Sequence, residues 1–248
     1  MNQAKRIWYQ RRLGWVGLSL LVLLSALWFA DRIDPLAMPQ DDMARVVVAQ
    51  DGTPLWRFAD HNGVWRYSVR LDQVSPYYIE ALLAYEDRWF YQHPGINPLA
   101  IARAAWQNLR GGQIVSGGST LSMQVARLLD PHPRTLRGKL RQVWRTAQLE
   151  WYLSKDEILT LYLNRALFGG TLEGVAAASW AYLGQSPSSL SRAQAALLAV
   201  LPQAPSRLRP DRHPQRAQAA RDKVFGRSRP LMMPYKNPCG WRRGMSRL

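Results

Sequence analysis

An uncharged apolar run near the amino terminus restricts most strongly how this chain can fold. Residues 13–30 read LGWVGLSLLVLLSALWFA and contain no charged side chain. A helix of that length extends about 27 Å, close to the roughly 30 Å of hydrocarbon in a bilayer. The run therefore predicts one membrane-spanning helix. A cleaved signal peptide and a buried core helix are the alternatives.

The charges on the two sides of this run differ in sign. The basic residues before it are Lys5, Arg6, Arg11 and Arg12, and the acidic residues after it are Asp31, Asp34, Asp41 and Asp42. Basic flanks remain cytoplasmic in single-pass proteins. We therefore expect a cytoplasmic basic tail (1–12), an anchor in a bacterial inner membrane (13–30), a linker (31–43) and a periplasmic body.

The remaining composition indicates one body with affinity for anions. Lys and Arg total 33 against 17 Asp and Glu, for a net charge of +16 among 248 residues. Such a charge attracts nucleic acid, anionic lipid or phosphorylated substrates, and an exported body argues against nucleic acid. A single cysteine, Cys239, allows neither an intrachain disulfide nor a cysteine-based zinc site.

Hydrophobic periodicity predicts a mainly α fold with a small β segment. Two β-like runs flank Asp51-Gly52 within residues 45–58, and residues 64–69 add a third. Helical spacing begins after Ser75, and Ser154 and Ser191 have capping-box spacing ahead of later helices. An alanine-rich helix is expected between residues 171 and 183. The body is assigned to residues 44–226, and residues 227–248 to a basic, disordered tail.

An acid lies at the end of the first apolar helical stripe of the body. The stripe continues to Glu86, which places a carboxylate on the core-facing side. Burial raises the pKa of a carboxyl group, and this suits a catalytic base. The alternative is a structural ion pair with Arg88 or Arg103. The other residues of the stripe are Ile79, Leu82, Leu83, Trp89 and Phe90.

Two further clusters carry groups suited to binding sugars or phosphates. The first is Gly117-Gly118-Ser119-Thr120 with Gln124, for which the alternative is a flexible loop with Ser119 capping a helix. The second is basic and comprises Arg127, Arg134, Arg137, Lys139, Arg141 and Arg145. Its alternative is the solvated face of a helix whose apolar stripe is Leu140, Val143, Trp144, Ala147 and Trp151.

These clusters resemble motifs of the peptidoglycan glycosyltransferase domain in class A penicillin-binding proteins. Glu86-Asp87-Arg88 with Phe90, His93 and Gly95 resembles its first motif, and the cluster at residues 117–124 its second. Lys155, Ile158, Tyr162 and Asn164 in SKDEILTLYLN resemble its fourth. The resemblance extends over residues 46–225 and is greatest to the penicillin-binding protein 1C type.

The resemblance implies a lysozyme-like helical fold that polymerises lipid II into β-1,4-linked glycan and releases undecaprenyl pyrophosphate. Glu86 would be the catalytic base. The implied partners are lipid II, the nascent glycan strand, the membrane and other cell-wall synthesis proteins. No cofactor is required, although Mg²⁺ or Mn²⁺ at the pyrophosphate fits the scheme, and residues 100–109 would enter the bilayer. The implied substrate-binding residues are Asp87, His93, Ser119, Thr120, Gln124, Arg127, Arg134, Lys139, Lys155 and Asn164.

Three departures from the family pattern are visible. Gln142 stands where the third motif has a second acid, and Glu150 is the nearest carboxylate that could replace it. The fifth motif is reduced to Arg221 and Val224. No Ser-x-x-Lys transpeptidase motif is present, and we expect a chain truncated before that domain. A catalytically impaired lipid II-binding scaffold and a muramidase-like hydrolase are the alternatives, but the basic cluster favours synthesis.

Overall fold

A computed structural model describes residues 3–38, 44–51, 54–98, 103, 106, 110 and 118–228. The chain divides into two units, Met1–Met38 and Pro39–Leu248, which are treated separately. Several expectations lie outside the described residues. They concern Gly52, Gly117, Cys239, most of the segment 100–109, and the tail beyond residue 228.

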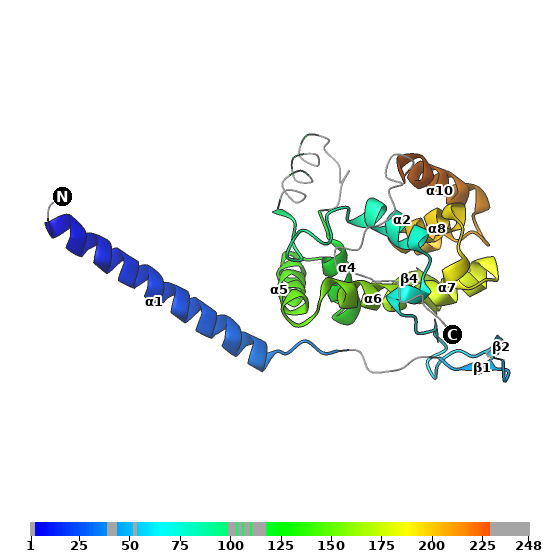
Figure 1. Ribbon diagram of the computed structural model, residues 1–248, viewed down its shortest axis with the longest axis horizontal. Helices are drawn as coiled ribbons and strands as arrows, with labels where there is room; N and C mark the ends of the chain where they lie inside the picture. The colour runs from blue at the N-terminus through cyan, green and yellow to red at the C-terminus, as the bar shows by residue number, and fades with distance from the viewer. Residues whose placement is uncertain are drawn as a thin grey trace, which may run out of the picture. The chain divides into compact units, whose positions relative to one another are not determined.

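The first unit is one long helix, α1 (Gln3–Ile33), drawn in blue in Figure 1. It contains the segment Gly14–Ile33, which is long and apolar enough to cross a membrane and is not buried within the structure. The helix begins before and ends after the apolar run of residues 13–30. No proline interrupts it before Pro35, so its backbone hydrogen bonds continue into both charged flanks.

The second unit is built mainly of helices, which confirms the predicted α fold with small β segments. Its longer described helices have at least nine residues each. They are α2 (Pro76–Glu86), α4 (Leu121–Leu129), α5 (Leu136–Tyr152), α6 (Lys155–Arg165), α7 (Gly174–Leu183), α8 (Arg192–Val200) and α10 (Pro214–Ser228). Short helices are η1 (Leu71–Gln73), η2 (Pro187–Ser189), η3 (Leu201–Gln203) and α9 (Pro205–Leu208).

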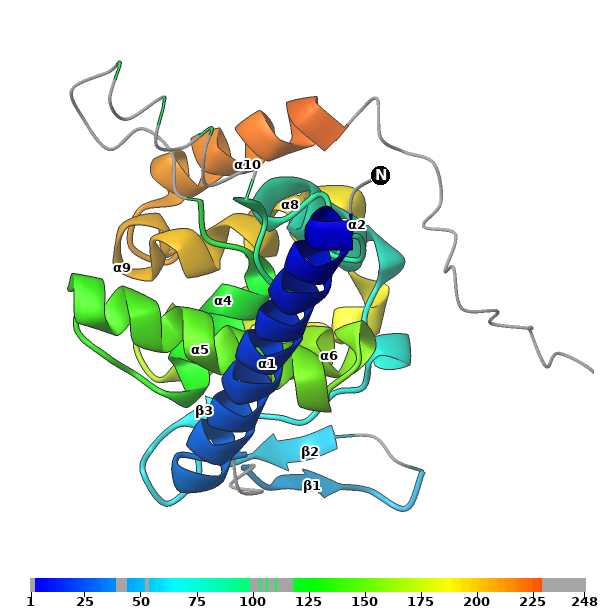
Figure 2. The same cartoon turned by 90° about the vertical axis from the view of Figure 1, so that its left-hand side faces the viewer.

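The helices pack in two connected groups, visible in Figures 1 and 2. Helix α8 packs against both α2 and α10, and α4 packs against both α5 and α6. The core between them contains large, fully buried side chains, among them Tyr78, Phe90, Tyr162 and Phe168. The capping boxes predicted at Ser154 and Ser191 are confirmed. The N-cap of α4 is Thr120 and not Ser119, because the Thr120 hydroxyl accepts the Met123 N–H.

The β segments form two separate sheets. Strands β1 (Val46–Val48) and β2 (Pro54–Arg57) make the predicted antiparallel hairpin. The third predicted strand, β3 (Trp65–Arg66), does not join it. It pairs in parallel with β5 (Leu172–Glu173), which also pairs with β4 (Leu167–Gly169). Because residues 172 and 173 are extended, the alanine-rich helix α7 begins at Gly174.

Helix α5 is oriented opposite to expectation. Its buried residues are Gly138, Gln142, Arg145, Thr146, Gln148 and Leu149. The stripe that was expected to face the core instead faces outward, with Leu140 and Trp151 exposed by 71% and 85%. The polar side is buried because it finds hydrogen-bond partners on α4 and in the loop after it, as described below. Helix α10 also continues to Ser228, past the expected end of the body at residue 226.

Candidate active site

Glu86 is the last residue of α2, directly before the chain leaves the helix. Asp87 caps the helix with φ −158° and ψ 81°, which ends the helical step. Phe90 is therefore placed by the turn that follows, where it is buried, and Trp89 is 50% exposed. The expectation that Trp89 continues the apolar stripe was wrong, because the stripe was extended beyond the end of the helix.

The Glu86 carboxylate has one hydrogen-bond donor and one buried free oxygen. Its Oε2 accepts a hydrogen bond of 2.7 Å from Nε2 of Gln124 on α4. Its Oε1 is inaccessible to solvent and has no partner among the described residues. The buried hydroxyls of Tyr78 and Tyr162 likewise have none, and the Glu86 charge adds to the burial that raises the pKa of both tyrosines. The first and second motifs therefore meet at this carboxylate.

Burial is the main cause that raises the pKa of Glu86. The hydrogen bond from Gln124 opposes this shift, and the neighbouring charge of Asp87 adds to it. Arg88 and Arg103 are both exposed, and neither forms an ion pair with Glu86 in the part of the chain that the structure describes. The structural ion pair considered from the sequence is therefore not formed, and the geometry favours a carboxylate that accepts protons.

Replacing Gln124 tests how this carboxylate is tuned. Gln124→Ala removes a donor that favours ionised Glu86, so the pKa of Glu86 should rise further. We expect the acidic limb of the pH-rate profile to move to higher pH, with the largest loss of rate on its acidic side. The matched control is Gln218→Ala at an exposed position of α10. An acidic limb that stays in place in Gln124→Ala would contradict the assignment.

Asp87 is buried and ties the turn after α2 to the start of α4. Its two oxygens lie 3.0 and 2.9 Å from Nε2 of His93, and Oδ2 also accepts the Leu121 N–H at 3.0 Å. Both side chains are below 10% exposed. Asp87 and His93 were expected to bind substrate. In the structure they hold α4, and so Gln124, beside Glu86, and their role in substrate binding stays a prediction.

Two other residues that were expected to bind substrate form hydrogen bonds with the backbone. Both Nδ2 hydrogens of Asn164 are donated, to the carbonyls of Val69 and Thr160, while its Oδ1 accepts the Val69 N–H. The Thr120 hydroxyl donates to the Gly95 carbonyl and caps α4. Both residues are buried. They fix segments far apart in the sequence and have no free polar group for a ligand.

Lys139, at the start of α5, carries a positive charge that no acid among the described residues neutralises. Its Nζ donates to Ser119 Oγ at 3.2 Å and to Gln142 Oε1 at 3.1 Å, and Gln142 Nε2 donates to the Met123 carbonyl at 2.6 Å. Partial burial lowers the pKa of Lys139, and the charge of Arg127 lowers it further. Gln142 therefore acts as a neutral bridge here. It leaves the charge of Lys139 available to an anion, where a carboxylate would have neutralised it.

The predicted basic cluster is divided by Asp130. Arg141 and Arg145 bind Asp130 at 2.6 and 2.8 Å, and these ion pairs hold α5 against the end of α4. Arg127 is only half-buried and donates to the His132 carbonyl at 3.3 Å, and Arg134 is exposed. Arg127 lies one turn beyond Gln124 on the same side of α4. Arg127 therefore shares a side of α4 with Gln124, and its charge acts on Lys139.

Glu150, the carboxylate considered in place of the missing second acid, is bound by two donors. It accepts hydrogen bonds from Ser122 and, at 2.7 Å, from Nζ of Lys155. Ser122 and Gln124 are two residues apart on α4 and so point to nearly opposite sides. Glu150 therefore lies on the side of α4 away from Glu86. Lys155 also lies 4.7 Å from the centre of the Phe90 ring, so this pair fixes the turn that follows α2.

Comparison with known proteins assigns this arrangement to a family. A family model described as transglycosylase matches residues 51–229, which include all residues of the site around Glu86. The chain belongs to the transglycosylase family. Penicillin-binding protein 1C of Escherichia coli is 66% identical over 215 residues, or 86% of this chain and 28% of that protein. Penicillin-binding protein 1A of Aquifex aeolicus is 42% identical over 163 residues, or 65% of this chain and 22% of that protein.

The transglycosylase chain thus spans less than a third of the length of these relatives. Among solved structures, the crystal structure of penicillin-binding protein 1A from Haemophilus influenzae matches 77% of this chain and 19% of its own. The sequence identity is 22% and the TM-score 0.41.

The described carboxylates of this transglycosylase do not form a metal site. Among the described residues, no group of three His, Cys, Asp or Glu side chains could hold a metal ion. Glu86 and Asp87 are neighbours, but both oxygens of Asp87 are used by His93 and Leu121. The divalent cation considered from the sequence, at the pyrophosphate, stays a prediction.

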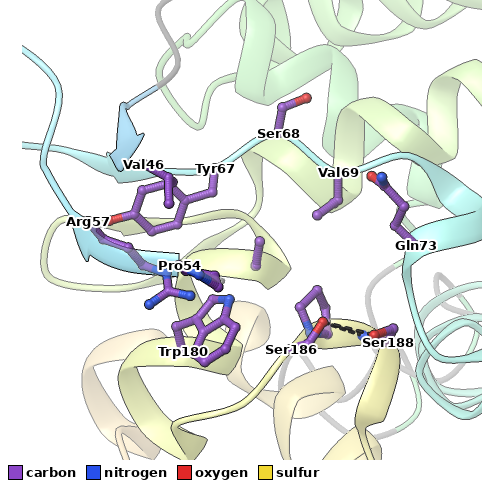
Figure 3. Close-up of a pocket in the computed structure, with 12 residues that line it drawn as sticks. Val46, Pro54, Arg57, Tyr67, Ser68, Val69, Gln73, Trp180, Ser186 and Ser188 are labelled. Carbon is purple, nitrogen blue, oxygen red and sulfur yellow. Dashed lines mark hydrogen bonds between the residues drawn. The ribbon is translucent and has the colours of Figure 1, made fainter. Parts of the chain in front are cut away.

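A cavity of about 420 Å³ lies elsewhere in the transglycosylase body, as Figure 3 shows. The Arg57 guanidinium stacks on Trp180 at 3.6 Å from the ring centre, and Tyr67 lies beside it. Strand β2 and helix α7 thereby meet across the cavity. None of the candidate catalytic or substrate-binding residues lines it, so it is separate from the site at Glu86.

Proposed function

We propose that this chain is a peptidoglycan glycosyltransferase that polymerises lipid II, with Glu86 as the base. The observation that carries the proposal is the mostly buried Glu86 carboxylate, which is bound by Gln124, a residue one helical turn from Arg127 on α4. A buried acid with a raised pKa can accept a proton near neutral pH. The cations Arg127 and Lys139 suit a leaving group that departs with negative charge.

The proposed reaction is a single displacement at the anomeric carbon of the growing chain. The 4-hydroxyl oxygen of the acceptor sugar forms the new β-1,4 bond while the bond between that carbon and the pyrophosphate oxygen breaks. The hydroxyl proton goes to Glu86, and the bonding electrons leave with undecaprenyl pyrophosphate. Arg127 and Lys139 stabilise the pyrophosphate charge, with Arg134 as an exposed third cation. Ser119, held by Lys139, contributes a neutral hydroxyl beside them.

Membrane attachment fits a lipid-linked substrate. The segment Gly14–Ile33 of α1 could anchor the chain, and basic residues precede it while acidic residues follow it. This asymmetry supports an inner-membrane protein whose catalytic unit lies in the periplasm. Other cell-wall synthesis proteins would be partners there.

The direct test is incubation of the detergent-solubilised protein with labelled lipid II. Synthesis predicts glycan polymer and released undecaprenyl pyrophosphate. Shortening of added glycan strands would instead indicate the muramidase-like hydrolase. Lipid II binding without any product would indicate the scaffold.

Lys139→Ala tests the cationic end of the site. Because Lys139 carries a charge that no described acid neutralises, its removal should lower the polymerisation rate by about 10²-fold. Arg141→Ala is the matched control, since it removes the same charge from the same helix, but from a side chain bound to Asp130. Initial rates of lipid II consumption measure both variants. Equal rates for Lys139→Ala and the unmodified protein would remove Lys139 from the proposed site.

A further inference from the structure

The outward face of α5 is apolar, whereas the outward face of a helix in a soluble body is normally polar. We define the outer face of α5 by Leu136, Leu140, Val143, Trp144, Ala147 and Trp151. These positions repeat at helical spacing and share a stripe about 100° wide. Leu136, Leu140 and Trp151 are 87%, 71% and 85% exposed, Ala147 is exposed, and Val143 and Trp144 are half-buried. A contiguous apolar stripe of this kind marks a contact surface.

Hydrogen bonds on the opposite face of the same helix fix this orientation. Gln142 and Arg145 are both buried, and each has specific partners. Gln142 bonds the Met123 carbonyl and Lys139, and Arg145 bonds Asp130 and Gln148. Rotating α5 to bury its apolar stripe would break these contacts and leave Arg145 without its carboxylate. The helix is therefore held with its apolar side outward.

We propose that the outer face of α5 rests in the interfacial layer of an anionic phospholipid membrane. The residues of this face and the cations beside it favour an anionic membrane as the partner. Trp144 and Trp151 are side chains that favour the boundary between water and hydrocarbon, and Leu136 and Leu140 are suited to shallow insertion. Arg137 borders the stripe on one side and Lys139 on the other, and Arg134 precedes it. Cations beside an apolar stripe match anionic headgroups.

If the proposed function holds, this membrane contact would bring the lipid-linked substrate to Lys139. Lys139 belongs both to the border of the outer face and to the cationic end of the site. An α5 lying in the interface holds that cation at the level of the headgroups. A pyrophosphate attached to a membrane lipid reaches it there without leaving the bilayer.

The test measures the depth of α5 with the full chain in vesicles of phosphatidylethanolamine and phosphatidylglycerol. In a Cys239→Ser background, an environment-sensitive fluorophore is attached to Leu140→Cys, and in a second variant to Trp151→Cys. The matched control is Gln218→Cys on α10, which is also exposed. Iodide quenches probes in water, and lipids with a nitroxide on the acyl chain quench probes in the membrane.

Both α5 probes should be quenched several-fold more by nitroxide lipid than the α10 probe, and less by iodide. Replacing phosphatidylglycerol with phosphatidylcholine should weaken this difference. Strong iodide quenching at both α5 positions would overturn the inference. So would protection from both quenchers, which would mean that another protein surface covers the face. Lipid II polymerisation in the same vesicles separates the two claims, because activity with α5 probes in water sinks only the membrane contact.

Discussion

Glu86→Gln should lower the rate of lipid II polymerisation by roughly 10²- to 10⁴-fold while lipid II binding persists. The amide keeps the size of the side chain, and its oxygen can still accept the hydrogen bond from Gln124. It cannot take the proton of the acceptor hydroxyl. Initial rates of polymer formation and a separate binding titration with lipid II measure the two effects.

Glu80→Gln is the control for this substitution. Glu80 is on the same helix, and burial likewise raises its pKa, but its face differs from that of Glu86 and it is not bonded to Gln124. Its variant should polymerise at the ordinary rate. Equal losses in both variants would show damage to α2 instead of loss of a base. Full activity in Glu86→Gln would end the assignment of Glu86.

The same substitution should raise stability, with a definite pH dependence. The pKa of Glu86 is raised in the folded state above its ordinary value of 4.5, so folding favours its protonated form. Ionisation therefore costs stability as pH rises through the folded-state pKa. The amide of the Glu86→Gln variant cannot ionise, so this variant should unfold at a higher temperature near neutral pH. The difference should vanish at pH values well below 4.5.

Asp87→Ala should cost about 3 kcal/mol of unfolding free energy. The change removes a buried carboxylate that accepts hydrogen bonds from His93 and from the Leu121 N–H, and both donor residues are buried. The loss is a large fraction of the roughly 5–15 kcal/mol that stabilises a domain. Denaturant unfolding measures it, and Asp87→Asn should lose less because it retains one acceptor.

Asp72→Ala is the matched control for stability. Asp72 also pairs with a basic residue, Arg70 at 2.9 Å, but the arginine is largely exposed and water replaces the lost contact. This variant should unfold at the same denaturant concentration as the unmodified protein. If Asp87→Ala did so too, Asp87 would not be the structural tie between α2 and α4.

Local patterns determined much of this protein. An uncharged apolar run of this length forms a helix in a membrane, because each backbone group must be hydrogen-bonded within the segment. The serines at positions 154 and 191 begin helices because their hydroxyls accept N–H groups three residues ahead. Glu86 was found because an acid at the end of an apolar stripe violates the pattern, and its pKa is raised by burial as that violation predicts.

Contacts between distant segments decided the rest. Whether Asp87, His93 and Asn164 face a ligand or a backbone depends on partners up to 95 residues away, and local spacing carries no record of them. Strand β3 pairs with β5 and not with the β1–β2 hairpin, and local spacing does not record this distant partner either. On α5 the periodicity was correct but its direction was wrong. The sequence shows which residues share a face, whereas the partners of Gln142 and Arg145 decide which face is turned inward, since buried polar groups must be hydrogen-bonded.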